Sequence, residues 1–222
     1  MIGRLTMVVV AATLITAPAA GQDAAQFRVG PRLGYVQYAE ETGIKPGAAL
    51  GMDAMYRLSR NIAFGVALGV SRPETDGQYF PAELSFGDTT YVFQVTQPLT
   101  ITTYQFALEF STGGSFAPFL SAAVGGYRVA LDPQVASGNR DFTHVALTLG
   151  GGVSIQAGGA ASIRLNVHDQ IFSRFDRAGL NTTRTLNQPV IFPEAVPPLP
   201  PFSGTAHNIM ASLGFYFTPG GN

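Results

Sequence analysis

Three residues in the last third of the chain are of the types that could activate a hydroxyl group. Asp169 and Ser173 lie four residues apart in the segment V-H-D-Q-I-F-S, and His207 follows in a later segment. A histidine beside a serine, oriented by a carboxylate, can make that serine a nucleophile toward an acyl ester. The plainer interpretation is a set of polar residues at strand ends, so the strands that carry them decide the matter.

The segment that carries His207, residues 206–217, alternates between two kinds of side chain. Ile209, Leu213, Phe215 and Phe217 fall on one face, and mainly small or polar residues fall on the other. A period of two indicates a β-strand. A large aromatic face opposite a small polar face is typical of a strand whose outer side meets lipid.

Eight segments of the chain show such alternation, each near the ~9–11 residues that a tilted membrane strand requires. They are residues 27–38, 48–58, 62–71, a segment that ends at 110, and residues 118–129, 142–156, 161–171 and 206–217. The alternation is cleanest in 62–71, where five large apolar residues alternate with alanine and glycine. Residues 118–129 are rich in glycine, and the facing of their side chains stays open. Residues 89–103 also have strand character, and we expect the fourth strand to project above the membrane with Pro98 at an edge or bulge.

The connections between these segments alternate in length. Residues 59–61, 112–115 and 157–160 are short, whereas 39–47, 72–99, 130–141 and 172–205 are longer. Short turns at one end and long loops at the other are typical of outer-membrane barrels. The sequence therefore predicts an all-β fold, an eight-stranded antiparallel up-and-down transmembrane β-barrel with short periplasmic turns and long extracellular loops.

The composition excludes several classes of function. The chain has no cysteine, a formal net charge of −1 and only 12% charged residues. Disulfides and cysteine zinc sites are impossible, and no basic surface indicates nucleic-acid binding. We find no metal-ligand spacing, phosphate loop or Gly-x-Ser-x-Gly motif, so we expect neither a metal nor a cofactor.

The N-terminus has the pattern of a secretory signal peptide. Arg4 precedes an apolar run that ends at Thr16, and small residues occupy 17–21. The run is too short to cross a bilayer, and its exit is Ala-x-Ala-like. We therefore predict a signal peptide at residues 1–21 and a barrel domain at residues 22–222.

The exported start, the eight alternating segments and the closing S-L-G-F-Y-F resemble small outer-membrane β-barrels of the OmpA/OmpX type. The resemblance extends from about residue 27 to residue 217. It implies a place in the outer membrane of a Gram-negative bacterium, contact with membrane lipid and lipopolysaccharide, and an assembly signal at Leu213, Phe215 and Phe217 for the insertion machinery. Two features depart from the family pattern: five residues follow Phe217, and the chain has no tryptophan. No residue pattern in the loops identifies an extracellular partner.

The alternation also assigns charged residues to the lumen. This polar network comprises Arg28, Arg32, Asp53, Arg57, Glu109, Arg164 and His168. Enclosed charges must pair or hold water. We expect Arg32 to lie opposite Asp53, and Glu109 to reach Arg57 or Arg164. Since side chains fill the interior of an eight-stranded barrel, the network favours a filled lumen over a proton or ion path.

Two other functions compete with a non-enzymatic surface protein. Some small outer-membrane barrels modify lipid A with His and Ser or Asp near the outer leaflet. Here Asp169 and Ser173 share the outward face, whereas His168 points inward, and antiparallel pairing brings His207 near Ile171 with the other two diagonal to it. The third class, a soluble lipocalin-like barrel, requires an apolar interior. Alanine and glycine on the inner face of 62–71 argue against it.

Overall fold

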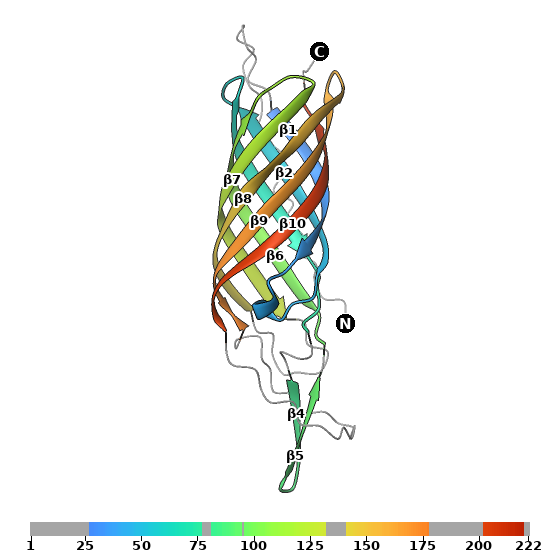
Figure 1. Cartoon of the computed structure of the whole chain (residues 1–222), viewed down its shortest axis with the longest axis vertical. Coiled ribbons are helices and arrows are strands. Elements are labelled where there is room, and N and C mark those ends of the chain that lie inside the picture. The colour runs from blue at the N-terminus through green and yellow to red at the C-terminus, as the bar shows by residue number, and fades with distance from the viewer. Residues whose placement is uncertain (1–26, 77–80, 95, 132–140, 178–201, 220–222) are drawn as a thin grey trace.

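The computed structural model describes residues 27–76, 81–94, 96–131, 141–177 and 202–219, and it forms a closed antiparallel barrel (Figure 1). The barrel strands run in the order β1-β10-β9-β8-β7-β6-β3-β2, which confirms the eight-stranded up-and-down prediction. Their bounds are Phe27–Gln37 (β1), Gly47–Arg57 (β2), Ile62–Ser71 (β3), Leu99–Ser111 (β6), Phe116–Leu131 (β7), Asp141–Gly158 (β8), Ala161–Asp176 (β9) and Ser203–Phe217 (β10). No helix among the described residues has the length and apolarity needed to span a membrane.

The barrel closes where its first and last strands pair. In this seam Val29 pairs with Phe217, and Leu33 pairs with Leu213. Closure leaves no free edge in the barrel, so every strand finds hydrogen-bonding partners on both sides. The short turns lie at one end, close to the end of β10, and the long connections lie at the other (Figure 1). We refer to these as the tight-turn end and the long-loop end.

The outer surface of the barrel carries the apolar face that the alternation predicted. Phe64, Val66 and Leu68 of β3 are exposed, whereas Ala63 and Ala67 of the same strand are buried in the interior. Every other barrel strand likewise exposes large apolar side chains. This facing contradicts a lipocalin-like barrel, in which polar residues would cover the outside.

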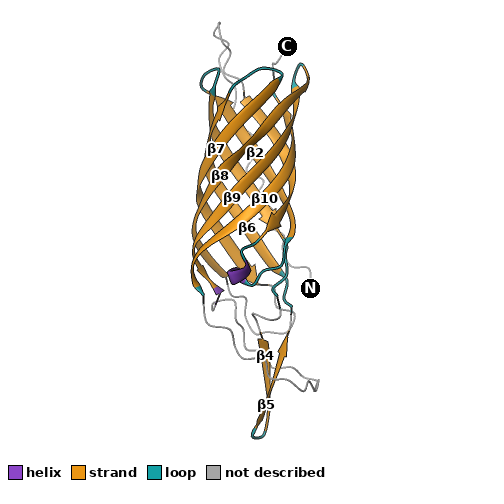
Figure 2. Ribbon diagram, viewed as in Figure 1, coloured by secondary structure: helices purple, strands orange, loops and turns teal. Residues whose placement is uncertain are grey.

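The prediction that the fourth barrel strand extends above the membrane through residues 89–103 is wrong. Residues 81–86 and 89–94 instead form a separate two-stranded hairpin of β4 (Pro81–Phe86) and β5 (Thr89–Gln94), with Gly87 in the left-handed region at its turn. The hairpin lies beyond the long-loop end of the barrel (Figure 2). Pro98 directly precedes β6, because proline provides no backbone N–H for the start of a ladder.

The base of this hairpin is fastened to the first long loop. Thr75 N donates to Gln97 O at 2.8 Å, Asp76 N donates to Gly43 O at 2.7 Å, and Lys45 N donates to the backbone oxygen of Glu74 at 2.9 Å. A 3-10 turn, η1 (Glu40–Thr42), completes this loop. Backbone hydrogen bonds thus join the β1–β2 connection to the connection that follows β3 at the long-loop end of the barrel.

Several strands are longer than the alternation indicated. β7 continues to Leu131, β8 runs from Asp141 to Gly158, and β9 continues to Asp176. The predicted loops 130–141 and 172–205 are therefore partly strand. The signal peptide prediction, residues 1–21, and most of the last long loop, residues 178–201, lie outside the described residues.

Candidate functional site

The interior near the tight-turn end is organised by one carboxylate. Glu109 of β6 accepts hydrogen bonds on Oε2 from Arg164 Nη2 of β9 at 2.7 Å and from Arg28 Nη2 of β1 at 2.9 Å. The side chains of Glu109, Arg164 and Arg28 are only 6%, 4% and 13% exposed. The Arg164 guanidinium also lies 3.7 Å above the ring of Phe119. These strands are not neighbours in the barrel, so the three charged groups tie its walls together across the lumen.

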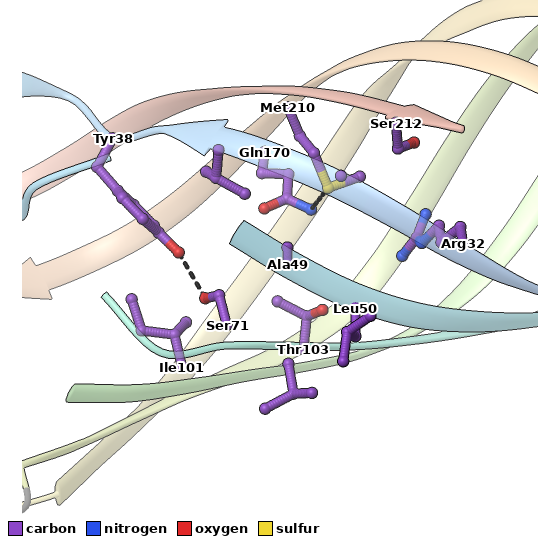
Figure 3. A pocket seen from close by; sticks show the side chains of 14 residues that line it. Arg32, Tyr38, Ala49, Leu50, Ser71, Ile101, Thr103, Gln170, Met210 and Ser212 are labelled. Carbon is purple, nitrogen blue, oxygen red and sulfur yellow. Dashed lines mark hydrogen bonds between the residues drawn. The ribbon is translucent and has the colours of Figure 1, made fainter. Parts of the chain in front are cut away.

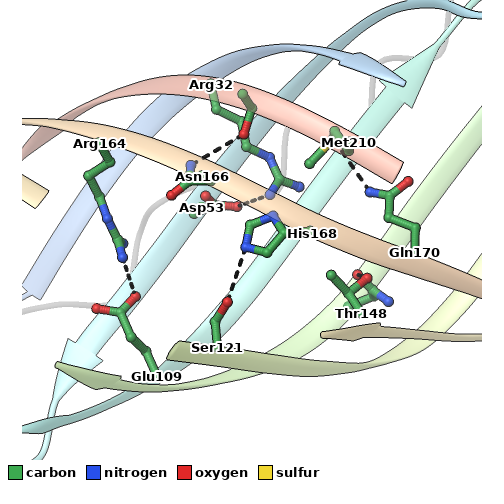
Figure 4. A network of polar contacts seen from close by, with 12 residues as sticks. Arg32, Asp53, Glu109, Ser121, Thr148, Arg164, Asn166, His168, Gln170 and Met210 are labelled. Carbon is green, nitrogen blue, oxygen red and sulfur yellow. Dashed lines mark hydrogen bonds and ion pairs between the residues drawn. The ribbon is translucent and has the colours of Figure 1, made fainter. Parts of the chain in front are cut away.

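A second charged group occupies the middle of the lumen. Arg32 Nη1 lies 3.6 Å from Asp53 Oδ1 (Figure 4). The Tyr216 hydroxyl donates a hydrogen bond to Asp53 Oδ2. The expected register is wrong, because Arg32 pairs with Gly51 and Asp53 pairs with Gly30. The arginine reaches the carboxylate diagonally, along the same face of the sheet.

Neutral polar side chains fill the space around this pair. His168 Nε2 lies 3.1 Å from Ser121 Oγ (Figure 4). Thr148 Oγ1 donates a hydrogen bond to Gln105 Oε1 at 2.9 Å. The cavity among these residues measures about 40 Å³. One water needs about 10–15 Å³ on this measure, so the space suits only a few waters.

Near the long-loop end the lumen changes from polar to apolar. Tyr127 of β7 stacks on Phe172 of β9, with centroids 4.1 Å apart and planes 6° apart, and Phe175 packs edge-on against Phe142 at 5.5 Å. The Tyr127 hydroxyl donates to the backbone oxygen of Ser173 at 3.0 Å. We call this the apolar cluster, and its buried members are Val36, Tyr38, Ile44, Ala49, Leu99, Ile101, Tyr127, Val129, Leu131, Ala146, Phe172, Phe175, Ala206 and Met210.

A buried tyrosine joins the apolar cluster to the polar lumen. The Tyr38 hydroxyl lies 2.6 Å from Ser71 Oγ (Figure 3). Burial raises the pKa of Tyr38 to about 12, and the hydrogen bond with Ser71 only partly offsets this. The phenol therefore stays protonated at neutral pH. The cavity beside it measures about 20 Å³, room for a single water.

Sequence reasoning missed the apolar cluster and several partners of the charged groups. Phe119, Ser121 and Tyr127 all lie in residues 118–129, whose facing the glycines left open. Phe172 and Phe175 lay in a segment that we assigned to a loop. The alternation of residues 127, 129 and 131 was the available signal, since these large side chains are separated by Arg128 and by the small residue Ala130.

Of the seven residues assigned to the polar network, six are buried or largely buried in the lumen. Arg57 is the exception, because it is exposed at the end of β2. It lines a wider cavity at the mouth of the tight-turn end, together with Arg28, Arg60 and Glu109. The structure therefore brings Glu109 to Arg164 and Arg28, and leaves Arg57 at the rim.

Of the three outward-facing residues that could form a catalytic group, the structure brings only His207 and Asp169 into contact, and not Ser173. His207 pairs with Ile171 across β10 and β9, and His207 Nδ1 lies 2.8 Å from Asp169 Oδ2. Ser173 Oγ donates instead to the backbone oxygen of Val145 at 2.8 Å. The register shifts here, because Ala206 pairs with Phe172 whereas Gly204 pairs with Phe175. The additional residue in β9 displaces Ser173 from the diagonal position that regular pairing would give it.

This arrangement has known relatives. The family described as outer membrane protein beta-barrel domain matches residues 7–187. The chain belongs to this family. Its location is accordingly the cell outer membrane, and the apolar outer face of the barrel is its lipid-facing surface.

Several solved structures are similar to the chain at low sequence identity. Neisserial surface protein A is 13% identical, with a TM-score of 0.55 over 86% of this chain and 96% of that one. The N-terminal barrel domain of Pseudomonas aeruginosa OprF is 13% identical, with a TM-score of 0.40 over 87% and 98%. Yersinia pestis Ail, solved with the heparin analogue sucrose octasulfate, is 11% identical, with a TM-score of 0.41 over 87% and 97%. No curated protein sequence matches the chain.

The three residues expected to form the assembly signal lie on the lipid-facing surface. Leu213, Phe215 and Phe217 of β10 are all exposed, and Phe217 pairs with Val29 in the closing seam. They are thus accessible from outside the barrel at its tight-turn end. Among the described residues, no group of three or more His, Cys, Asp or Glu side chains is placed to hold a metal ion.

Proposed function

We propose that this protein is a non-enzymatic surface protein whose filled barrel presents its outer loops to the environment. The observation that carries the proposal is the β4–β5 hairpin, which extends past the rim on a base fastened to the first long loop. By the asymmetry general to such barrels, the long-loop end faces outward. Ordered structure beyond the membrane is where barrels carry recognition.

The contents of the lumen support a role that does not depend on transport. The two inner cavities measure about 20 Å³ and 40 Å³, and the apolar cluster lies between them and the outside. Eight strands leave an interior that side chains can fill. The barrel then serves as a rigid membrane anchor in contact with lipid and lipopolysaccharide.

The experiment removes the hairpin and leaves the barrel. Residues 82–93 are replaced by two glycines, and cells that express either protein, or neither, are compared for attachment to epithelial monolayers and to polystyrene. Wild-type cells should attach more than vector cells, and the deletion should abolish the difference at an equal level of heat-modifiable protein. Equal attachment by all three strains would contradict the proposal.

A lipid A-modifying enzyme is the second candidate, and the His207–Asp169 contact on the lipid-facing surface favours it. The position of Ser173 argues against it, because its hydroxyl donates to Val145 O and not to the histidine. The test compares lipid A from cells that express wild-type protein or His207→Ala by mass spectrometry. A change in acyl pattern that requires His207 would establish the enzyme, whereas an unchanged pattern supports the surface protein.

A further inference from the structure

An apolar hollow on the lipid-facing surface, over β8, β9, β10 and β1, has no part in the proposed surface role. At its centre, Ala211 of β10 pairs with Tyr35 of β1 on one side and with Val167 of β9 on the other. Both neighbours are large and more than half exposed, so the small side chain between them leaves a gap in the outer face. Leu165 and Leu213 line the gap on the side of the tight-turn end. The hollow measures about 690 Å³, and we call it the groove.

Polar side chains lie on the same outer face at the other end of the groove. Ile209, the next outward residue of β10, pairs with Gln37 of β1 and with Asp169 of β9. Asp169 is therefore diagonal to Ala211, at about 7–8 Å between Cα atoms. His207, one outward position further, contacts Asp169 Oδ2 through Nδ1 at 2.8 Å. An apolar groove with a polar end has the form of a site for an amphiphile.

The contact with Asp169 determines what His207 can bind. An ionised carboxylate only accepts hydrogen bonds, so the imidazole donates from Nδ1 and, in its neutral form, presents a lone pair at Nε2. The side chain of His207 is 60% exposed, and the contact does not use Nε2. A hydroxyl group can donate to this lone pair, whereas a fully ionised phosphate has no proton to donate. The exposed amide of Gln37 can donate to a hydroxyl group or accept from it, so the polar end favours a sugar over a phosphate.

The surroundings of the groove determine its occupant. The chain is an outer-membrane protein, so the outer face of the barrel meets lipid, and hydrocarbon chains fill a hollow in that face. β10 begins at Ser203 at the long-loop end, which faces outward in such barrels, so the polar end of the groove lies on the outward side. Lipid tails are as apolar as leucine, so the groove itself gains only packing, and selectivity depends on the head of the lipid.

We infer that the groove binds one acyl chain of an outer-leaflet glycolipid whose sugar hydroxyl groups hydrogen-bond with His207 and Gln37. Tyr35 and Val167 form the walls of the groove and Ala211 forms its floor. Asp169 orients the imidazole so that Nε2 meets the sugar. The site is separate from the β4–β5 hairpin, so the inference does not depend on the proposed surface role.

The test refolds the mature protein in a non-ionic detergent without lipid, adds equimolar lipid A or phosphatidylcholine, and counts the lipid retained by native mass spectrometry. Wild-type protein should retain one lipid A molecule and much less phosphatidylcholine, whose head has no hydrogen-bond donor. Ala211→Phe should reduce the retained lipid A by about tenfold or more, because the ring fills the space of the acyl chain. Ala122→Phe is the matched control, since Ala122 is also exposed on the outer face but lies on β7, which does not line the groove.

Two substitutions of His207 test the polar end while the groove stays intact. His207→Leu should reduce retained lipid A by about tenfold, because the acceptor for the sugar hydroxyl is lost. His207→Gln should retain lipid A, because the amide oxygen still accepts a hydrogen bond.

Heat-modifiable migration reports the folded barrel in every variant, and Ala211→Leu fills the groove with a smaller side chain if phenylalanine prevents folding. Equal retention of lipid A by wild type and the folded Ala211 variants would overturn the inference. Equal retention of lipid A and phosphatidylcholine by wild type would also overturn it, because the polar end would then select nothing. A dimer that Ala211→Phe disrupts would assign the groove to a second copy of the chain and would overturn it as well.

Discussion

Glu109→Gln should strongly destabilise the barrel although it hardly changes the shape of the side chain. The amide has nearly the same volume as the carboxylate, so packing against Arg28 and Arg164 is preserved. Its charge is lost, however, and two guanidiniums that are 13% and 4% exposed then share the lumen without a counter-charge. Removal of one member of a buried ion pair costs about 3–5 kcal/mol. We expect a loss of this size in the free energy of unfolding.

The measurement is urea titration of the protein in lipid vesicles, followed by circular dichroism and by heat-modifiable gel migration, because the chain has no tryptophan for fluorescence. Asp141→Asn is the matched control: it removes the carboxylate of the Arg128 pair, whose side chains are 46% and 56% exposed, and should cost about 0–1 kcal/mol. Addition of Arg28→Gln to Glu109→Gln should recover part of the loss, since one uncompensated charge disappears. A loss no larger than that of Asp141→Asn would refute the assignment of Glu109 as the tie across the lumen.

Four further outcomes follow from the structure. Phe172→Ala should lower the free energy of unfolding by about 3–5 kcal/mol in the same urea assay, because it leaves a cavity in the apolar cluster. Gly152→Ala should prevent formation of the heat-modifiable band, since its Cβ would lie 1.9 Å from the Leu165 backbone oxygen, whereas Gly47→Ala, with no atom nearer than 3.4 Å, should fold normally. Phe217→Asp should reduce insertion as judged by cell fractionation, and normal insertion at normal levels would count against the assembly signal. Planar-bilayer recordings of pure protein should show no large stable conductance, and reproducible porin-sized openings would contradict a filled lumen.

The fold could be predicted from the sequence because two independent patterns agreed. Alternation with a period of two defined each strand and the face that meets lipid, and the alternating lengths of the connections gave the order and direction of the strands. The bounds of β3 were predicted to the residue, Ile62–Ser71. The β4–β5 hairpin was not predicted, because residues 81–94 show the same strand propensity whether they extend a barrel strand or pair with each other.

The pairings in the lumen were less predictable than its inventory of charges. Side chains alternate between the two faces of a strand, so the position of a residue within its strand is enough to assign it to the interior or the outside. This alternation assigns Arg32, Asp53, Glu109 and Arg164 to the interior. A contact requires the register between strands, which depends on the conformation of the loops that join them. The Arg32 register was wrong by two residues, yet the diagonal contact with Asp53 survived because a shift of two preserves the face.

The position of each group along the barrel axis separates two sources of stability. The apolar cluster at the long-loop end stabilises through packing, whereas Glu109, Arg28 and Arg164 near the tight-turn end stabilise through paired charge. Phe172→Ala and Glu109→Gln change groups that share no partner, so their losses in the free energy of unfolding should add within about 0.5 kcal/mol in the double variant. A larger deviation from additivity would show that the lumen acts as one coupled network and that packing and charge do not contribute separately.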